Sequence, residues 1–521
     1  MSLQPKHMPQ AENPRAVPLV ASERSGDKGG TKGGLTLSKK LPYLILSAFL
    51  LGIGLHSFYP TIRVPVLIWY ILGLALLLAV CISYGLKNYA PFLIVLALAL
   101  GVWRFDISLP DMDELAFGWN QRIGRVEEQM NGLFGRQFYV KLETGHKILI
   151  STDQFLILGE TITFECALSG LVRREQDSDS RFAALWHRAQ AKCGASNLQR
   201  AAPPAWWDTR QMFHDWRTWS NKRIASVLPG DQGVLIAGML YGERNMTQES
   251  QDMFRRAGLT HLIAVSGSNI TIVATIMFAI FLGTGLWRSQ AFWFTSGALL
   301  AYVGLTGFSA SVARAAFMGW LVLLARHLGR KPKIWYLLLL AAVILCVIDP
   351  WMLFFDAGFA LSFLATMGLM LWTPIMTRKL DFVPAFAGLQ EAAATTFSAT
   401  LMTMPYSALM FGKISLAGLF TNLVAVPLVP WAMLFGTAAA VWGRFQGYTL
   451  VSLPALGVSQ TIFLSARIAD IFPWLSIEVE NINWMLIISI YILIVYFWFK
   501  LRQKNQLSTR FEIFCQKNSE Q

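Results

Sequence analysis

Long apolar runs separated by short charged loops are the feature that most limits what this chain can fold into. Three such runs occupy residues 42–59, 64–86 and 89–104. Each is close to the roughly 20 residues that an α-helix needs to cross a bilayer. Hydrophobic residues make up 54% of the chain and charged residues only 14%, which is more apolar surface than a soluble domain can bury. The sequence therefore predicts a polytopic α-helical membrane protein.

Further apolar runs follow in the second half of the chain. They are expected at 260–286, 290–308, 310–328, 334–350, 353–375, 393–412, 415–441, 452–472 and 484–500. Two of them, 393–412 and 452–472, are interrupted or amphipathic. With the first three runs, the total is about twelve spans.

Basic residues predict the orientation of these spans. Residues 1–40 are polar and are expected to form a disordered cytoplasmic tail. Three crossings then place the next segment outside, and the later basic clusters fall in inner loops, as the positive-inside rule requires. These clusters contain Arg288, Arg326, Arg330, Lys331, Lys333, Arg378, Lys379, Arg444, Lys500, Arg502, Lys504 and Arg510. Both termini are therefore expected in the cytoplasm, with residues 501–521 as the second tail.

The segment at 105–205 differs in composition from the spans and is expected to form an extracytoplasmic domain. Residues 136–143 alternate apolar and polar side chains, and a second alternating run at 146–151 completes a predicted β-hairpin. A third strand is expected at 160–167. Several short strands in about 100 residues favour a small β-barrel that is OB-like.

Three aromatic residues of this segment, Tyr139, Phe155 and Trp186, have two interpretations. They are either platforms on which nucleic-acid bases stack or part of the barrel core or its lid. The second interpretation is favoured.

The five cysteines show no C-x-x-C pair and no zinc spacing, so no metal site is predicted. Cys166 and Cys193 both fall in the extracytoplasmic segment, where a disulfide persists. A bridge and two buried thiols remain alternatives. The chain also has no phosphate-binding G-x-x-x-x-G-K-[ST] loop, so it is not expected to hydrolyse nucleotides. No cofactor is predicted.

Residues 206–258 are expected to contain interfacial amphipathic helices. In the first, Phe213, Trp216, Ile224 and Val227 share one face, which either lies among lipid headgroups or packs on the barrel. A second, short helix is expected from Thr247 to Arg256, with the threonine as its N-cap.

Arginines gather around this second helix. Arg255 and Arg256 lie in its last turn, and Arg244 lies just before it. They either complement the helix dipole or attract an anionic polymer to the outer mouth of the next span.

The span that follows carries the strongest local signal, at the start of a transmembrane core that is expected over 259–441 and is followed by C-terminal spans over 442–500. It has His261 near its mouth and a polar break of Ser266, Gly267, Ser268 and Asn269. In hydrocarbon, freed backbone groups are tolerated only where they face protein or a water-filled cavity. We therefore expect this break to line an aqueous path for an anionic passenger.

Two charges lie about one turn into later spans: Arg314 and Asp356. Each needs a partner or water, because a charge within a span costs at least ~3 kcal/mol on insertion scales. The expected arrangements are a mutual ion pair, separate exposure to an aqueous vestibule, or snorkelling to the interface.

Several ordered segments resemble one known family. The resemblance lies in the residues at 240–244, 254–267, 305–309, 356–364 and 422–428, which read LYGER, FRRAGLTHLIAVSG, LTGFS, DAGFALSFL and NLVAVPL. They resemble the competence region of ComEC-type DNA-internalisation proteins, in the family's order, over about 235–435. By position, His261, Ser266, Gly267, Arg314 and Asp356 match family motif residues, whereas a second histidine common after the Ser-Gly is replaced by Ser268-Asn269.

The resemblance implies an inner-membrane channel that admits single-stranded DNA to the cytoplasm during natural transformation, in a bacterial inner (plasma) membrane. Many members carry a C-terminal metallo-β-lactamase-like domain, and no H-x-H-x-D-H is present here. The chain is therefore not expected to be an enzyme, and a separate nuclease, a periplasmic DNA receptor and a cytoplasmic motor or single-strand-binding proteins are implied. Two other functions remain open: a secondary transporter with a broken-helix site, and an intramembrane serine hydrolase using Ser266 and His261.

Overall fold

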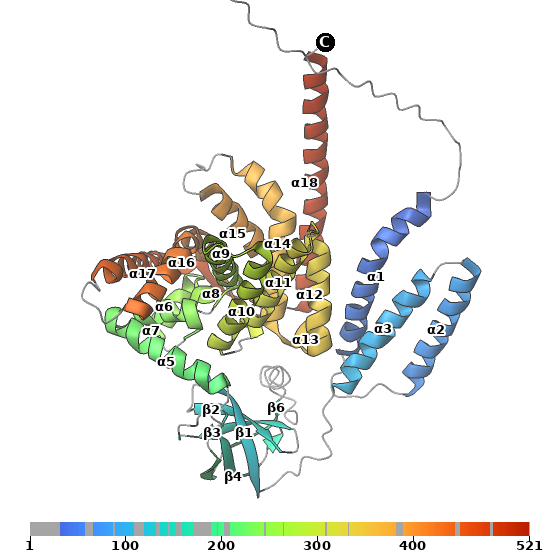
Figure 1. Cartoon of the computed structure of the whole chain (residues 1–521). Helices are drawn as coiled ribbons and strands as arrows, with labels where there is room; N and C mark the ends of the chain where they lie inside the picture. Colours follow the sequence, from blue (N-terminus) through green and yellow to red (C-terminus); the bar gives the residue numbers. More distant parts are fainter. Residues whose placement is uncertain are drawn as a thin grey trace, which may run out of the picture. The chain divides into compact units, whose positions relative to one another are not determined.

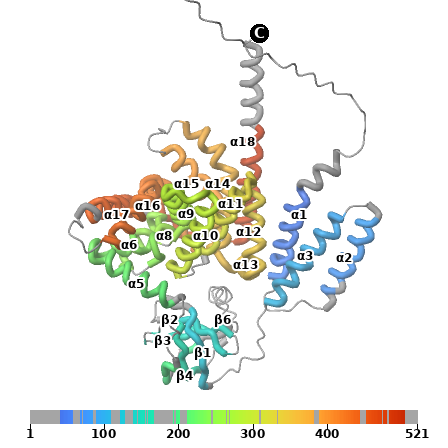
Figure 2. Tube along the Cα trace, viewed as in Figure 1, coloured from blue at the N-terminus to red at the C-terminus, as the bar shows by residue number. Residues whose placement is uncertain are grey.

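The computed structural model of the chain is mainly helical, with one large sheet inserted after the third helix (Figure 1). The chain divides into residues 1–42, of which the structure describes only the first part of α1, and residues 43–521, which contain every other element. Figure 2 follows the course of the chain. The structure describes residues 32–57, 66–86, 89–108, 119–131, 136–143, 146–152, 154, 156, 159–167, 169–170, 189–194, 196–202, 209–243, 246–263, 265–307, 310–331, 333–381, 389–442, 449–479 and 483–519.

Three N-terminal helices correspond to the first three apolar runs. They are α1 (Lys32–Ser57), α2 (Val66–Leu86) and α3 (Ala90–Ile107). Helices α1 and α3 touch through their backbones, because a Cβ atom on Gly52 or on Gly101 would collide with a carbonyl oxygen of the other helix. Small residues therefore set the spacing of this pair.

The inserted domain is a seven-stranded sheet. Its strands are β1 (Trp119–Asn131), β2 (Arg136–Leu142), β3 (Lys147–Thr152), β4 (Thr161–Ala167), β5 (Ser169–Gly170), β6 (Ala189–Gly194) and β7 (Ser196–Ala202). The order across the sheet is β5-β6-β3-β2-β1-β4-β7, with β3 and β6 parallel and the other pairs antiparallel. The hairpin and the third strand expected from alternation are β2, β3 and β4.

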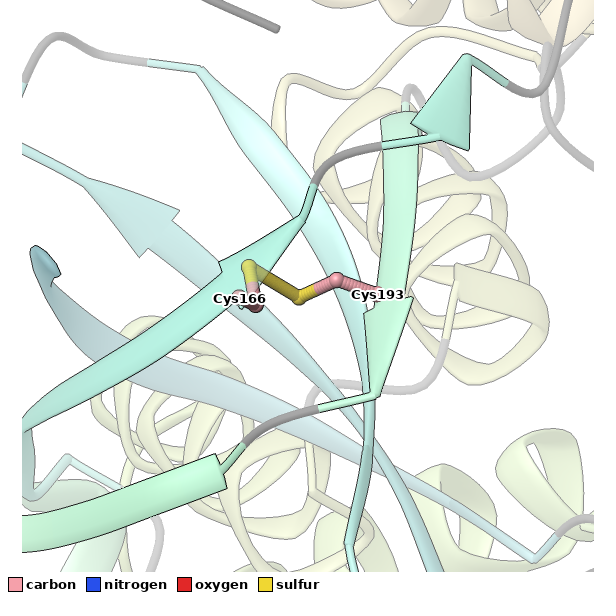
Figure 3. Close-up of a disulfide and its surroundings, with 2 residues drawn as sticks. All are labelled: Cys166 and Cys193. Atoms are coloured by element: carbon pink, nitrogen blue, oxygen red, sulfur yellow. A yellow bond between two sulfur atoms is a disulfide. The ribbon is translucent and has the colours of Figure 1, made fainter. Parts of the chain in front are cut away.

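The sheet curls around its own core. Cys166 on β4 and Cys193 on β6 form a disulfide with their Cα atoms 5.8 Å apart (Figure 3), although β3, β2 and β1 lie between these strands in the sheet. A flat sheet would hold them about 19 Å apart at the usual strand spacing. The curl makes a half-barrel whose interior contains side chains such as Phe138, Ile148 and Phe164.

Tyr139 belongs to the buried part of this domain. Only 3% of it is exposed, so it does not offer a free face to a stacking base. The core interpretation is the one that the structure shows for this residue. Phe155 and Trp186 lie outside the described residues.

Helices α5 (Thr209–Val227), α6 (Asp231–Tyr241) and α7 (Gln248–Arg256) follow the sheet. Ile224 and Val227 of α5 are buried in a cluster shared with α6, α16 and α17. Ile224 and Val227 thus pack on other helices, whereas Trp216 on the same face is 47% exposed. Sequence periodicity identified the face, whereas two of the covering helices, α16 and α17, come from distant parts of the chain.

The remaining helices follow the later apolar runs closely. They are α8 (Thr260–Ile263), α9 (Gly267–Gly283), α10 (Arg288–Leu305), α11 (Ala310–His327), α12 (Ile334–Ile348), α13 (Met352–Phe355), α14 (Ala357–Lys379), α15 (Leu389–Phe411), α16 (Ala417–Trp442), α17 (Thr449–Asp470) and α18 (Trp484–Ser519). The expected first span of this group is two helices, α8 and α9, and the expected fifth is α13 and α14. A two-stranded sheet pairs β8 (Lys413–Ser415) with β9 (Ser476–Glu478).

Five helical segments in the described part of the chain are long and apolar enough to cross a membrane. They are Lys40–Ser57, Ala90–Ile107, Ala357–Lys379, Ala417–Trp442 and Trp484–Gln503, and shorter apolar helices include Asn269–Gly283. Large apolar side chains such as Leu74 and Leu300 are about 70% exposed, which in water would be an aggregation hazard. The chain is an α-helical membrane protein.

Candidate functional site

The candidate site starts where α7 ends, at a tight turn into α8. Gly258 has a φ of +71°, and the amide of Leu259 donates to Phe254 O over 2.9 Å, as in a glycine-terminated helix. A Cβ atom on Gly258 would come within 2.8 Å of the Cα atom of Gly418 in α16. Glycine therefore serves two purposes here: it permits the turn and it lets α16 approach.

The expected polar break lies between α8 and α9. Helix α8 ends at Ile263, Ser266 is extended with φ −93° and ψ 162°, and α9 begins at Gly267. The side chain of His261 on α8 is exposed, and so is Gly267. The side chain of Ser268 lies outside the described ones.

Asn269 fixes the break to a neighbouring helix. It is 2% exposed, and its Nδ2 donates to Met239 O of α6 over 3.0 Å. The hydroxyl of Ser266 donates to Asn269 Oδ1 over 2.9 Å. The side chain of Asn269 thus stabilises the bend between α8 and α9 through both of these hydrogen bonds. Among the described residues of this span that were predicted to line the path, His261 and Gly267 are exposed.

Arg314 and Asp356 form an ion pair between α11 and α14. Arg314 is only 1% exposed, which excludes snorkelling. Asp356 is also the N-cap of α14 and accepts a hydrogen bond from the amide of Phe359 over 2.9 Å. The carboxylate therefore serves both a helix terminus and a buried guanidinium.

Gly358 makes room for this pair. A Cβ atom there would lie 2.7 Å from Nη2 of Arg314 and 3.0 Å from Oδ1 of Asp356. The Nε atom of Arg314 is buried without a hydrogen-bond partner, so part of its donor capacity is unused. The role of Gly358 was not predicted from the sequence. The signal that could have indicated it is its position two residues after a charged N-cap.

The break and the ion pair are neighbours. Gly267 at the start of α9 faces α11, because a Cβ atom on it would lie 3.5 Å from the Cβ atom of Ala315. Ala315 is the residue after Arg314. The structure therefore brings together the expected break and both expected intramembrane charges, from helices α9, α11 and α14.

The arginines at the expected entrance carry less free charge than the sequence implied. Arg255 pairs with Asp252 at 2.7 Å, and Arg256 makes two contacts, of 2.5 and 3.2 Å, with Asp470 of α17. These arginines are half exposed but neutralised by carboxylates, and Asp470 was not anticipated as a partner. Arg244 lies outside the described residues.

Metal ligands do not gather in the described residues: no group of three or more His, Cys, Asp or Glu side chains is found there that could hold an ion. The candidate site, as described, therefore consists of polar and ionic contacts between helices.

Comparison with known proteins identifies the family. Residues 239–504, just over half of the chain, match the family model described as "Competence protein". The chain belongs to the Competence protein family. This agrees with the ComEC-type resemblance, and the matched region contains the break, the ion pair and all helices from α8 to α17.

Two curated proteins are similar to part of the chain. ComE operon protein 3 of Bacillus subtilis (strain 168) is 28% identical over 217 residues, which cover 42% of this chain and 27% of that protein. Uncharacterized protein YcaI of Escherichia coli (strain K12) is 28% identical over 224 residues, covering 39% of this chain and 28% of that protein. The aligned residues therefore span less than a third of either relative. No solved structure matches the chain.

Proposed function

We propose that this member of the Competence protein family is the inner-membrane channel through which single-stranded DNA enters the cytoplasm during natural transformation. One observation supports this most directly: the region that matches the family contains a broken helix beside an arginine–aspartate pair whose arginine is buried. Polar breaks and ionisable residues within a membrane are costly and mark pathways for ions or substrates.

Electrostatics favours a hydrated channel over a simple carrier. A strand crossing ~30 Å of hydrocarbon holds at least a handful of phosphates at once. At ~3 kcal/mol each, bare passage would cost upwards of ~15 kcal/mol. A water-filled path with cationic groups removes that barrier.

In this proposal Arg314 is the cation that meets the passing phosphates. The present structure is then the closed state, in which the carboxylate of Asp356 is bound to the guanidinium of Arg314. An arriving phosphate exchanges with the carboxylate, because guanidinium binds both anions in the same two-pronged geometry. His261 and Gly267 contribute exposed polar surface on the way.

The proposed topology has about twelve spans, with both termini in the cytoplasm and an extracytoplasmic OB-like domain. The pairing of β8 with β9 supports it, since both strands lie in loops that this topology places outside. The strand pattern supports an OB-like domain: a β1-β2-β3 meander, β4 antiparallel to β1, and a later strand, β6, parallel to β3. A periplasmic DNA receptor, a separate nuclease and a cytoplasmic motor or single-strand-binding proteins complete the proposal.

Complementation of a deletion strain tests this function. The wild-type gene should restore transformation and the appearance of labelled DNA in the cytoplasm. Arg314→Ala and Asp356→Ala should each abolish cytoplasmic uptake and leave DNA bound at the cell surface. Arg326→Ala at the exposed end of α11 is the matched control and should transform normally.

The exchanged pair Arg314→Asp with Asp356→Arg separates folding from function. It keeps opposite charges next to each other but moves the cation to α14. Membrane levels should therefore recover in part, because the ion pair is kept while the N-cap of α14 is lost, and uptake should stay low. If both single variants reach the membrane and transform at the wild-type frequency, the assignment of this site is wrong.

A further inference from the structure

A cavity of about 920 Å³ lies among α6, α7 and α17, away from the broken helix. Its walls are the start of α6 at Gly230–Gln232, the start of α7 at Thr247 and Ser250, and one face of α17. The α17 face contributes Gly457, Gln460, Thr461, Phe463, Leu464 and Arg467. The volume is in the range of small-molecule sites.

The cavity lining holds an anion. Asp231 accepts hydrogen bonds from the amide of Thr247, over 3.1 Å, and from the Thr247 hydroxyl. Burial acts to raise the pKa of Asp231, but hydrogen bonds from Ser250 and Thr247 outweigh it, so the pKa lies below its ordinary value. Asp231 is therefore ionised at neutral pH.

The lining also holds a cation that is not neutralised. Arg467 is exposed, and the described residues give it no ion pair. The carboxylate one turn along α17, Asp470, is already taken by Arg256 at 2.5 Å. Asp231 and Arg467 thus line one cavity without neutralising each other.

Apolar surface adjoins these charges. Leu464 lines the cavity and is 56% exposed. Leu453 and Ile468 of the same helix are 67% and 50% exposed. A ligand that fills the polar cavity therefore lies beside an apolar strip of α17 that hydrocarbon can cover.

We infer that this cavity binds the headgroup of a zwitterionic phospholipid, with the phosphate on Arg467, the ammonium group on Asp231 and an acyl chain along Leu464. The two opposite charges of the cavity, Asp231 and Arg467, favour a headgroup that carries both a cation and an anion. A nucleic-acid strand or an anionic lipid would bring negative charge to Asp231 and offer it no cation. A free phosphate would leave both Asp231 and the apolar strip unused.

Native mass spectrometry of the full-length protein in detergent tests the inference. The probes are dioleoyl phosphatidylethanolamine and dioleoyl phosphatidylglycerol, which share a phosphate and acyl chains but differ in the ammonium group. Wild-type protein should retain the ethanolamine lipid in preference. Arg467→Gln should weaken binding of both lipids about tenfold or more, the loss of a charge-assisted contact.

Two further variants separate the charges from the shape of the cavity. Asp231→Asn should remove the preference and bring the two lipids to similar retention. Thr461→Trp, which fills the cavity and leaves both charges in place, should weaken both lipids. Arg326→Gln, outside the cavity, is the control and should bind as wild type.

The inference is overturned if Arg467→Gln and Thr461→Trp retain lipid as wild type does, or if Asp231→Asn keeps the preference. Phosphoethanolamine without acyl chains should compete weakly; competition equal to that of the lipid would assign the cavity to a small phosphate ester. Displacement of the lipid by oligo(dT) would assign it to DNA. Transformation is not the readout, so this test stands apart from the channel proposal.

Discussion

At the scale of single residues, the pair of Arg314 and Asp356 is the most constrained contact of the site. A guanidinium that is 1% exposed depends on its carboxylate partner, since removing one member of a buried pair leaves an unpaired charge and costs about 3–5 kcal/mol. The unused Nε donor gives the guanidinium capacity for a second anion. In the proposed channel, this contact stabilises the closed arrangement until a phosphate replaces the carboxylate.

Gly358→Ala tests how closely the pair is fitted. The added methyl group would lie 2.7 Å from Nη2 of Arg314, so we expect the variant to lose about 1–3 kcal/mol of stability and to transform poorly. Thermal unfolding followed by size-exclusion chromatography measures the loss. Gly319→Ala on α11, where a Cβ atom meets nothing within 4 Å, should keep its stability. Equal stability of the two variants would contradict the described contact.

The sequence alone identified these residues but not the groups that they contact. Ser266, Asn269, Arg314 and Asp356 were found because polar groups stand out in apolar runs. The acceptor of the Asn269 amide is a backbone carbonyl, that of Met239, 30 residues earlier. A carbonyl has no sequence signature, so only the fold shows that Asn269 is structural.

At the scale of elements, strands were predictable where alternation is regular. Strands β2, β3 and β4 alternate cleanly, but β1 (Trp119–Asn131) was missed. Its register shifts between Val126 and Glu128, and such a bulge breaks the two-residue period. Strands β5, β6 and β7 are short or polar and pair across long sequence separations.

The disulfide is an element-scale constraint, since it joins β4 to β6 across the curl of the sheet. We expect Cys166→Ser and Cys193→Ser each to lower the stability of the β-sheet domain by about 2–4 kcal/mol, and the double variant by no more than either single one. Limited proteolysis with mass spectrometry measures cleavage within 119–202. Cys81→Ser, at an exposed cysteine of α2, should digest like wild type. Identical digestion of all variants would show that the bridge does not support the domain.

At the scale of the whole molecule, the position of α16 tests the proposed topology. Arg223 of α5 donates to Val441 O near the end of α16 over 2.9 Å. If α16 crosses the bilayer from outside to inside, Val441 lies near the inner face and α5 cannot lie wholly in the outer headgroup layer. Sequence reasoning treated α5 and α16 separately, so this conflict was not visible to it.

Cysteine labelling of Arg444→Cys measures where the α16–α17 connection lies, in a background that carries Cys81→Ser and, because Cys515 lies in the tail expected in the cytoplasm, also Cys515→Ser. The twelve-span proposal predicts that a membrane-impermeant maleimide labels it only in inverted vesicles. Arg378→Cys at the end of α14 is the control, and the topology places it on the same side. Labelling of Arg444→Cys from outside in intact spheroplasts would remove two spans and keep both termini in the cytoplasm.

The central claim, that DNA passes the broken helix, is tested most directly by blocking it from outside during uptake. Thr260→Cys, at an exposed position before His261, is treated with a bulky hydrophilic thiol reagent in the Cys81→Ser background. We expect labelling and loss of cytoplasmic DNA, while DNA bound at the surface stays unchanged. Leu300→Cys, exposed on the apolar surface of α10, should remain unlabelled and transform normally. Full uptake through a protein labelled at Thr260→Cys would contradict the account.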